Sequence, residues 1–84
     1  MSERHEVLQV VLPLIQKYVP ERLRTVTISE STELSKDLGI NSAYVVDIIL
    51  SLEESLVLKP GDVYAFKTVG DLVDYVMLQR NAKS

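Results

Sequence analysis

The sequence predicts an all-α fold, a four-helix bundle with three longer helices and one short helix. Apolar residues recur at intervals of three and four residues in the segments 3–19, 42–55 and 68–80. A capped stretch at 62–66 supplies the short helix. The 84 residues are enough for one small domain, which we expect to cover residues 1–84.

The first helix is expected over about residues 3–19. Its apolar stripe consists of Val7, Val11, Leu14 and Tyr18, with Leu8 and Ile15 beside it. Pro13 points away from this stripe, so we expect it to kink the helix on its solvent side rather than to end it. Pro20 ends the segment, because the residue before a proline disfavours the helical conformation.

A long loop is expected over residues 20–40, between the first two long helices. Polar residues predominate there, around isolated apolar residues that we expect to hold the loop on the core: Leu23, Val26, Ile28, Leu34 and Leu38. A loop of about twenty residues is unusual in a compact domain, and such loops tend to have a function.

The second helix, expected over residues 42–55, has two apolar stripes. The core stripe consists of Val45, Ile48, Ile49, Leu52 and Leu56. The outer strip consists of Ala43, Val46 and Leu50, and it is flanked by Asp47, Glu53 and Glu54. An exposed apolar strip bordered by acids predicts a docking surface for a partner with a basic rim. In the alternative, the helix is buried on two sides of the bundle and the acids form a solvated edge.

Two further helices follow the turn at Lys59–Asp62. Asp62 is the expected cap of the short helix at 62–66. Thr68 and Asp71 have the spacing of a capping box at the start of the last helix, which we expect over residues 68–80. The apolar face of that helix consists of Val69, Leu72, Val73, Val76 and Met77.

Composition limits the classes of function. The net charge is −3 at pH 7 and the basic residues are scattered, so nucleic-acid binding is not expected. Cysteine is absent, which excludes disulfide and thiolate sites and favours a cytoplasmic location. No apolar run is long enough to span a membrane, and no membrane partner is expected. The single histidine, His5, has no partner at metal-ligand or general-base spacing, so we expect no metal site and no enzymatic activity.

Asn41 and Ser42 stand at the start of the second helix. We expect Asn41 to be the N-cap and Ser42 to be the first helical residue. The first N–H groups of a helix lack intrahelical partners and the helix dipole is positive there, so a phosphate esterified to Ser42 would lie in a favourable field. On the local pattern alone, ordinary helix capping accounts for both residues.

Two stretches of the sequence resemble a known family. "DLGINSAYVVDIILSLEE", residues 37–54, resembles the acyl carrier protein signature, in which Asp-Leu-Gly and two further residues precede a serine that opens an apolar and acidic helix. "KTVGDLVDYV", residues 67–76, resembles the opening of the last helix of that family. The layout of helices and loops over about residues 3–80 is also similar, and it implies a bundle of the acyl carrier protein type.

The resemblance implies that Ser42 is esterified with 4′-phosphopantetheine, taken from coenzyme A by a phosphopantetheinyl transferase. The thiol of this group would hold acyl groups as thioesters for acyl-transferring or synthase enzymes of lipid, polyketide or related biosynthesis. A monomer is expected. The residues expected to contact the partner enzymes are Asn41, Ala43, Tyr44, Val46, Asp47, Leu50, Glu53 and Glu54.

Three positions depart from the family pattern. The family usually has Asp before the serine and Leu, Met or Ile after it, whereas this chain has Asn41 and Ala43. Tyr44 stands where a small or acidic residue is common. These departures indicate a specialised carrier rather than the housekeeping carrier of fatty acid synthesis. The alternative function is an unmodified protein of the same fold that acts as a protein–protein interaction module.

Overall fold

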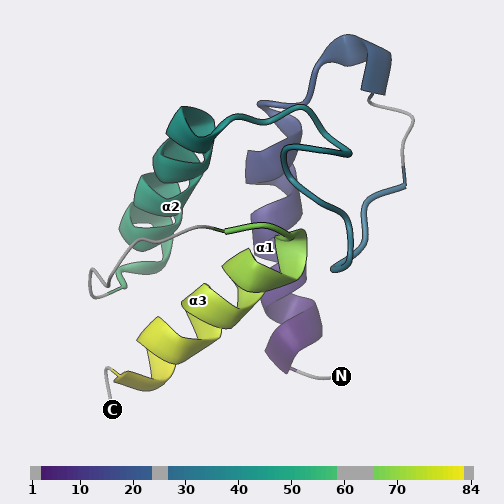
Figure 1. The fold of residues 1–84 in the computed structure, drawn as a ribbon. Coiled ribbons are helices and arrows are strands. Elements are labelled where there is room, and N and C mark those ends of the chain that lie inside the picture. Colours follow the sequence, from purple (N-terminus) through teal and green to yellow (C-terminus); the bar gives the residue numbers. More distant parts are fainter. Residues whose placement is uncertain (1–2, 24–26, 59–65, 83–84) are drawn as a thin grey trace.

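Three α-helices and one 3-10 turn form the regular structure of the described chain. The computed structural model describes residues 3–23, 27–58 and 66–82. The elements are α1 (Glu3–Gln16), η1 (Glu21–Leu23), α2 (Ser42–Leu56) and α3 (Val69–Ala82), shown in Figure 1. The predicted all-helical fold is confirmed for these ranges. The predicted short helix lies outside them except for Phe66, which is not helical.

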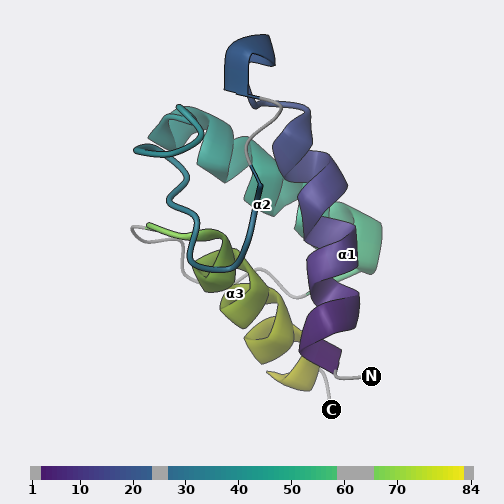
Figure 2. The ribbon, with the colours of Figure 1, turned by 90° about the vertical axis from the view of Figure 1, so that its right-hand side faces the viewer.

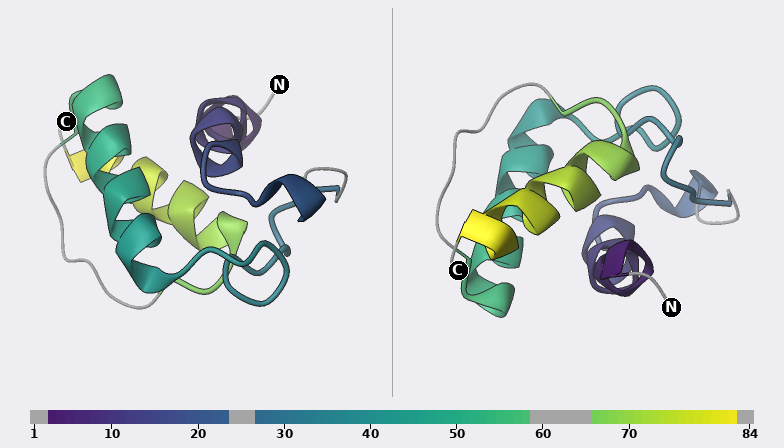
Figure 3. Two further views of the ribbon diagram at one scale, coloured as in Figure 1. Left: turned by 90° about the horizontal axis from the view of Figure 1, so that it is seen from above. Right: turned by 90° about the horizontal axis from the view of Figure 1, so that it is seen from below.

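The three helices surround one core. α1 packs against both α2 and α3. Viewed nearly along α1, both other helices lie to one side of it (Figure 3). The core contains residues from each helix and from the loop: Val7, Val11 and Ile15; Leu34, Leu38 and Ile40; Val45, Ile48, Ile49 and Leu52; Val69, Leu72, Val73 and Val76. Leu56, predicted in the core stripe, is half-buried against this cluster.

α1 ends at Gln16 rather than at residue 19 as predicted. Beyond Gln16 the hydrogen bonds join residues three apart instead of four. The Tyr18 N–H donates to the Ile15 carbonyl at 2.9 Å, and the Val19 N–H donates to the Gln16 carbonyl at 3.3 Å. Such three-residue bonds are typical of a last helical turn, here just before Pro20. Pro13 lies inside α1 and is exposed. The prediction that Pro13 points to solvent and does not end the helix is confirmed.

Part of the segment before α2 runs beside the start of α3 (Figure 2) and is hydrogen-bonded to it. The Gly70 N–H donates to the Glu30 carbonyl at 2.8 Å, and the Val69 N–H donates to the Thr32 carbonyl at 3.0 Å. A Cβ atom on Gly70 would come within 3.0 Å of the Glu30 carbonyl oxygen. Glycine therefore permits the close approach of the two segments. Val26, predicted to hold this loop on the core, lies outside the described residues.

α3 begins with the predicted capping box. The Asp71 N–H donates to the Thr68 hydroxyl at 3.2 Å, and the Thr68 N–H donates to the Asp71 carboxylate at 2.9 Å. The Lys67 N–H donates to the same carboxylate oxygen at 2.8 Å. Chiefly through the Thr68 backbone N–H, these bonds lower the pKa of Asp71, although partial burial opposes the shift. Aspartate thus replaces the usual glutamate or glutamine of this motif.

α2 ends on a residue with left-handed backbone geometry. Val57 has φ 52° and ψ 53°, and the Leu58 N–H donates to the Glu53 carbonyl at 2.8 Å. This bond is the one that closes a Schellman motif, in which glycine is the usual left-handed residue. A branched valine in this conformation is strained, so the end of α2 is defined by its hydrogen bonds rather than by backbone preference.

Candidate functional site

The start of α2 is capped as the sequence predicts. Asn41 has extended backbone geometry (φ −81°, ψ 170°), and its side-chain oxygen accepts the Tyr44 N–H at 3.1 Å. The Val45 N–H donates to the Asn41 carbonyl at 3.1 Å, which is the first helical bond. Ser42 is the first residue of α2 and its side chain is exposed. The predicted roles of Asn41 as N-cap and Ser42 as first helical residue are confirmed.

The segment before Asn41 fixes the position of this helix start. The Glu33 N–H donates to the Asp37 carboxylate at 2.8 Å, and the Gly39 N–H donates to the Ser35 carbonyl at 3.0 Å. Gly39 has φ +67°, a conformation that glycine adopts without strain. The buried side chain of Ile40 follows directly. Ser42 therefore stands two residues beyond a core anchor, on a backbone held by local hydrogen bonds.

The first turn of α2 can receive a phosphate group. The Tyr44 N–H already donates to the Asn41 side chain. The N–H groups of Ser42 and Ala43 lie before Val45, the first residue whose N–H donates a helical hydrogen bond. These groups and the positive end of the helix dipole favour a negative charge at the Ser42 hydroxyl. An exposed hydroxyl with adjacent N–H groups suits a phosphodiester. The described neighbours of Ser42 on α2 include neither a histidine nor a lysine that could act as a base.

The two stripes of α2 have the burial that the pattern predicts. The core stripe residues Val45, Ile48, Ile49 and Leu52 are buried. The outer strip is open: Val46 is 41% exposed, Leu50 is 55% exposed, and Ala43 is exposed beside them. Other described elements do not cover the outer strip. The alternative of a helix buried on two sides is therefore wrong for the described structure.

The three acids that flank the outer strip differ in exposure and in hydrogen bonding. Asp47 and Glu54 are exposed, whereas Glu53 is half-buried and accepts a hydrogen bond from the Tyr75 hydroxyl on α3 at 2.5 Å. On the α1 side, the ring of Tyr44 lies against Tyr18, with the centroids 5.3 Å apart. Within the described ranges, Glu53 is thus the one of the eight predicted contact residues that forms a hydrogen bond to another helix. The sequence pattern did not reveal the contact between Tyr18 and Tyr44.

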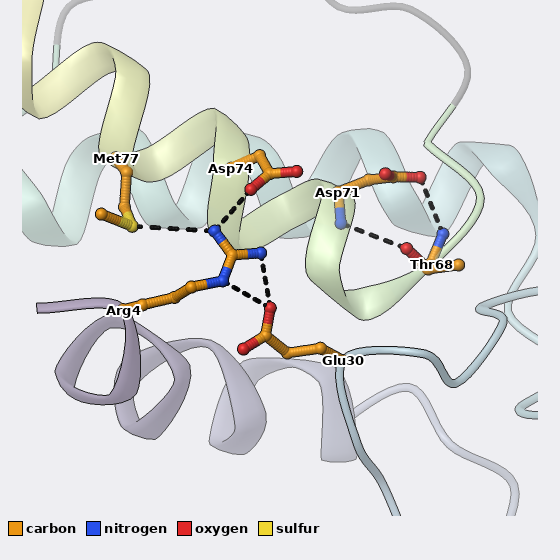
Figure 4. Close-up of polar contacts among 6 residues, drawn as sticks. All are labelled: Arg4, Glu30, Thr68, Asp71, Asp74 and Met77. Atoms are coloured by element: carbon orange, nitrogen blue, oxygen red, sulfur yellow. Dashed lines mark hydrogen bonds and ion pairs between the residues drawn. The ribbon is translucent and has the colours of Figure 1, made fainter. Parts of the chain in front are cut away.

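The ion pairs of the described chain lie away from the outer strip. Arg4 on α1 donates from Nε to Glu30 at 2.7 Å and from Nη1 to Asp74 on α3 at 2.5 Å (Figure 4). The hydrogen bond to Glu30 raises the pKa of Arg4 most, and the hydrogen bond to Asp74 raises it further. The other ion pairs in these ranges are Glu33–Lys67, at 4.0 Å, and Glu3–Arg80, at 3.8 Å. Within the described residues, Asp47 and Glu54 consequently take part in no ion pair.

Comparison with known proteins assigns the chain to a family. The family model described as "Phosphopantetheine attachment site" matches residues 13–76, which include all of α2. The chain is a member of the acyl carrier protein family. Its relatives include the acyl carrier protein of Helicobacter pylori, 38% identical over 66 residues that cover 74% of this chain and 85% of that protein. The acyl carrier protein of Clostridium perfringens is 45% identical over 49 residues, 56% of this chain and 63% of that protein.

The group that this family carries is phosphopantetheine, and the start of α2 fits its phosphate. The exposed Ser42 hydroxyl and the first N–H groups of α2 would hold the phosphate end. Among the other serines of the matched range, the Ser29 hydroxyl bonds to Ser31 and Ser51 is half-buried within α2, whereas Ser35 and Ser55 are exposed but do not lie in the first turn of a helix. None of the described helices has the length and apolar content needed to cross a membrane.

Proposed function

We propose that Ser42 carries 4′-phosphopantetheine and that the protein delivers acyl groups to partner enzymes of lipid, polyketide or related biosynthesis. The observation that carries this proposal is the exposed hydroxyl at the capped N-terminus of α2, inside the range that matches the family. When bound, the group supplies a thiol that holds acyl groups as thioesters. The chain contains no cysteine, so every thiol reaction of the protein would depend on this group.

The residues of the chain hold and present the group rather than catalyse a reaction. Asn41 keeps the first turn of α2 formed, and the N–H groups of Ser42 and Ala43 stabilise the phosphate charge. The buried Ile40 fixes the attachment point relative to the core. The protein is therefore a carrier, and the chemistry belongs to its partners. The names of its relatives support this role.

The outer strip of α2 is the surface on which partner enzymes dock. Ala43, Val46 and Leu50 supply apolar contact, and Asp47 and Glu54, which form no ion pair with any described residue, supply negative charge. A partner with a basic rim around an apolar patch fits this arrangement. Glu53 contributes less than predicted from the sequence, because its carboxylate accepts a hydrogen bond from Tyr75. The specialised role, the monomeric state, the cytoplasmic location and the short fourth helix stay predictions.

The alternative is an unmodified interaction module that uses the same outer strip. The open strip supports docking whether or not Ser42 is modified, and Asn41 and Ala43 depart from the family pattern at the attachment site. One measurement separates the two functions. The protein is incubated with coenzyme A and a broad-specificity phosphopantetheinyl transferase, and its intact mass is determined.

We expect the mass to increase by one phosphopantetheine. The Ser42→Ala variant should gain nothing, whereas the matched control Ser55→Ala, changed at an exposed serine near the other end of α2, should gain the same mass as the wild type. An unmodified wild-type protein, or equal modification of the Ser42→Ala variant, would refute the assignment. The first of these results would favour the interaction module.

A further inference from the structure

The loop before α2 is held on α3 at both ends of a short stretch. At the later end, the Leu34 N–H donates to the Lys67 carbonyl at 2.9 Å, and the side chain of Leu34 is buried in the core. At the earlier end, the Gly70 N–H donates to the Glu30 carbonyl at 2.8 Å. Glu30 is half-buried. The stretch therefore has an apolar anchor at one end and a polar anchor at the other.

The polar anchor is a cluster of ion pairs around Arg4 on α1. The Arg4 guanidinium contacts Glu30 through Nε at 2.7 Å and through Nη2 at 2.5 Å, and its Nη1 contacts Asp74 on α3 at 2.5 Å (Figure 4). The sulfur of Met77 lies 3.9 Å from the same Nη1. The Arg4 side chain is 38% exposed, so ions of the solvent can reach it. One side chain of α1 thus ties the loop to α3.

This cluster has one positive charge for two negative charges. Glu30 and Asp74 lie on opposite sides of the guanidinium group (Figure 4). Within the described ranges, both carboxylates form their ion pairs with Arg4. If the positive charge were removed, two like charges on different elements would face each other at short range and repel. Attachment of the loop at Glu30 therefore depends on the charge of Arg4.

Gly70 permits Glu30 to lie close enough to α3 to be held. A Cβ atom at position 70 would lie 3.0 Å from the Glu30 carbonyl oxygen and 3.4 Å from its Oε1. Contacts this short would require Glu30 to move by a few tenths of an ångström. Arg4 restrains Glu30 through its carboxylate, so Glu30 can yield less while the ion pairs are formed.

We infer that Arg4, Glu30 and Asp74 form an ionic clamp that holds the stretch 27–33 closed against α3 and allows it to open while the helices stay folded. The helices share a core of buried apolar residues to which the three clamp residues do not belong. The stretch 27–33, by contrast, is exposed or half-buried except at Thr32. A segment with few buried contacts opens locally at a lower cost than the whole domain unfolds.

Opening of the clamp affects the segment that leads to α2. The Ile40 N–H donates to the Leu34 carbonyl at 2.9 Å, and Leu34 is the apolar anchor of the clamped loop. The clamp is therefore a conformational device in front of the proposed attachment site, and it does not require modification of Ser42. Because added salt weakens ion pairs that solvent can reach, we expect it to favour the open loop.

The test is native-state amide hydrogen exchange of the full chain, measured residue by residue. The Gly70 N–H reports on the clamp, and the N–H of Ile49, a buried residue of α2, reports on global unfolding. Arg4→Ala should speed exchange at Gly70 about two- to thirtyfold relative to Ile49. The matched control Arg80→Ala removes the pair with Glu3, which joins α1 to α3 without the loop, and it should leave this ratio unchanged.

Two further measurements test the charge of the clamp. Asp74→Asn, added to Arg4→Ala, should slow exchange at Gly70 again because it removes the repulsion with Glu30. Added sodium chloride should speed exchange at Gly70 in the wild type, where it screens attraction, and slow it in Arg4→Ala, where it screens repulsion. The wild-type salt titration tests the clamp without any substitution.

A double-mutant cycle tests the role of Gly70. Gly70→Ala should lower the urea midpoint of unfolding more in the wild type than in Arg4→Ala, because Glu30 can yield only when Arg4 no longer holds it. The inference is overturned if Arg4→Ala changes exchange at Gly70 and Ile49 by the same factor. It is also overturned if Asp74→Asn does not slow the exchange of Arg4→Ala, if salt acts in the same direction on both proteins, or if the two effects on the urea midpoint are equal.

Discussion

Replacement of Asn41 by alanine should destabilise the protein through the start of α2. The Asn41 side chain accepts the Tyr44 N–H at 3.1 Å, and alanine offers no acceptor for it. Loss of an N-cap of this kind costs about 1 kcal/mol. In a domain of this size, that loss corresponds to a decrease in Tm of about 4–8 °C. Asn41→Asp keeps the acceptor and adds negative charge at the positive end of α2, so it should raise stability by about 0.3–1 kcal/mol at pH 7.

Thermal and urea unfolding of the two variants measure these effects. The gain from Asn41→Asp should disappear below about pH 4, where an aspartate becomes protonated. Ser55→Ala is a matched control on the exposed side of α2, and it should leave stability unchanged or slightly higher because alanine favours helices. If Asn41→Ala unfolds at the same temperature and urea concentration as the wild type, the cap does not stabilise α2 and the reasoning is wrong.

Three further predictions concern docking, pH and specificity. The double variant Asp47→Lys and Glu54→Lys should load acyl groups more slowly than the wild type but unfold at the same temperature. The difference in loading rate should decrease with added salt, because rim charges act on the rate of association. Equal loading rates of variant and wild type would count against the docking surface. Asp71→Asn should lower stability at pH 7 by about 1 kcal/mol, measured by urea unfolding. Since the folded pKa of Asp71 is lowered, its contribution is present above about pH 4 and is lost as the pH falls through the folded value, so wild type and variant should converge in acid. Finally, a housekeeping malonyl transferase and ketosynthase should use the modified protein poorly, and Asn41→Asp with Ala43→Leu should restore turnover; equal use of this protein and a standard carrier would exclude specialisation.

Residue spacing in the sequence predicts the buried faces and the N-terminal caps of the helices, because these features depend on residues that are close together in the chain. The apolar spacing of α2 predicted that Ile48 and Leu52 are buried, and the structure confirms it. The Thr68 and Asp71 spacing predicted the capping box of α3, and Asn41 was predicted as the N-cap of α2. These features involve residues within one or two helical turns, so their geometry follows from the period of the helix.

Contacts between distant segments could not be predicted in the same way. Arg4 binds Glu30 and Asp74, which are 26 and 70 residues away in sequence, and no helical period links them. Glu53 lies near the border between the two stripes, so only the position of α3 decides that its carboxylate meets Tyr75. Both contacts depend on how the helices pack together. A sequence pattern assigns a residue to a face of its own helix, but it does not say which element lies opposite.

The left-handed Val57 illustrates a different limit. Glycine is the usual signal for this conformation, and a branched residue gives no such signal. The hydrogen bond from Leu58 to Glu53 and the burial of Leu58 hold the turn in spite of the strain at Val57. Tertiary packing thus overrides the preference of a single residue, and the end of α2 falls at Leu56 rather than at residue 55.

The separation of the two stripes has a consequence for how this carrier can acquire new partners. Exposed substitutions away from caps and packed contacts usually change stability by less than about 0.5 kcal/mol. Ala43, Val46 and Leu50 are exposed, so they can change with little effect on the core that holds Ser42 in place. Tyr44 differs from them because its ring packs against Tyr18, which couples the docking face of α2 to the segment that follows α1. A change of partner that requires a different residue at position 44 should therefore be accompanied by a change at position 18.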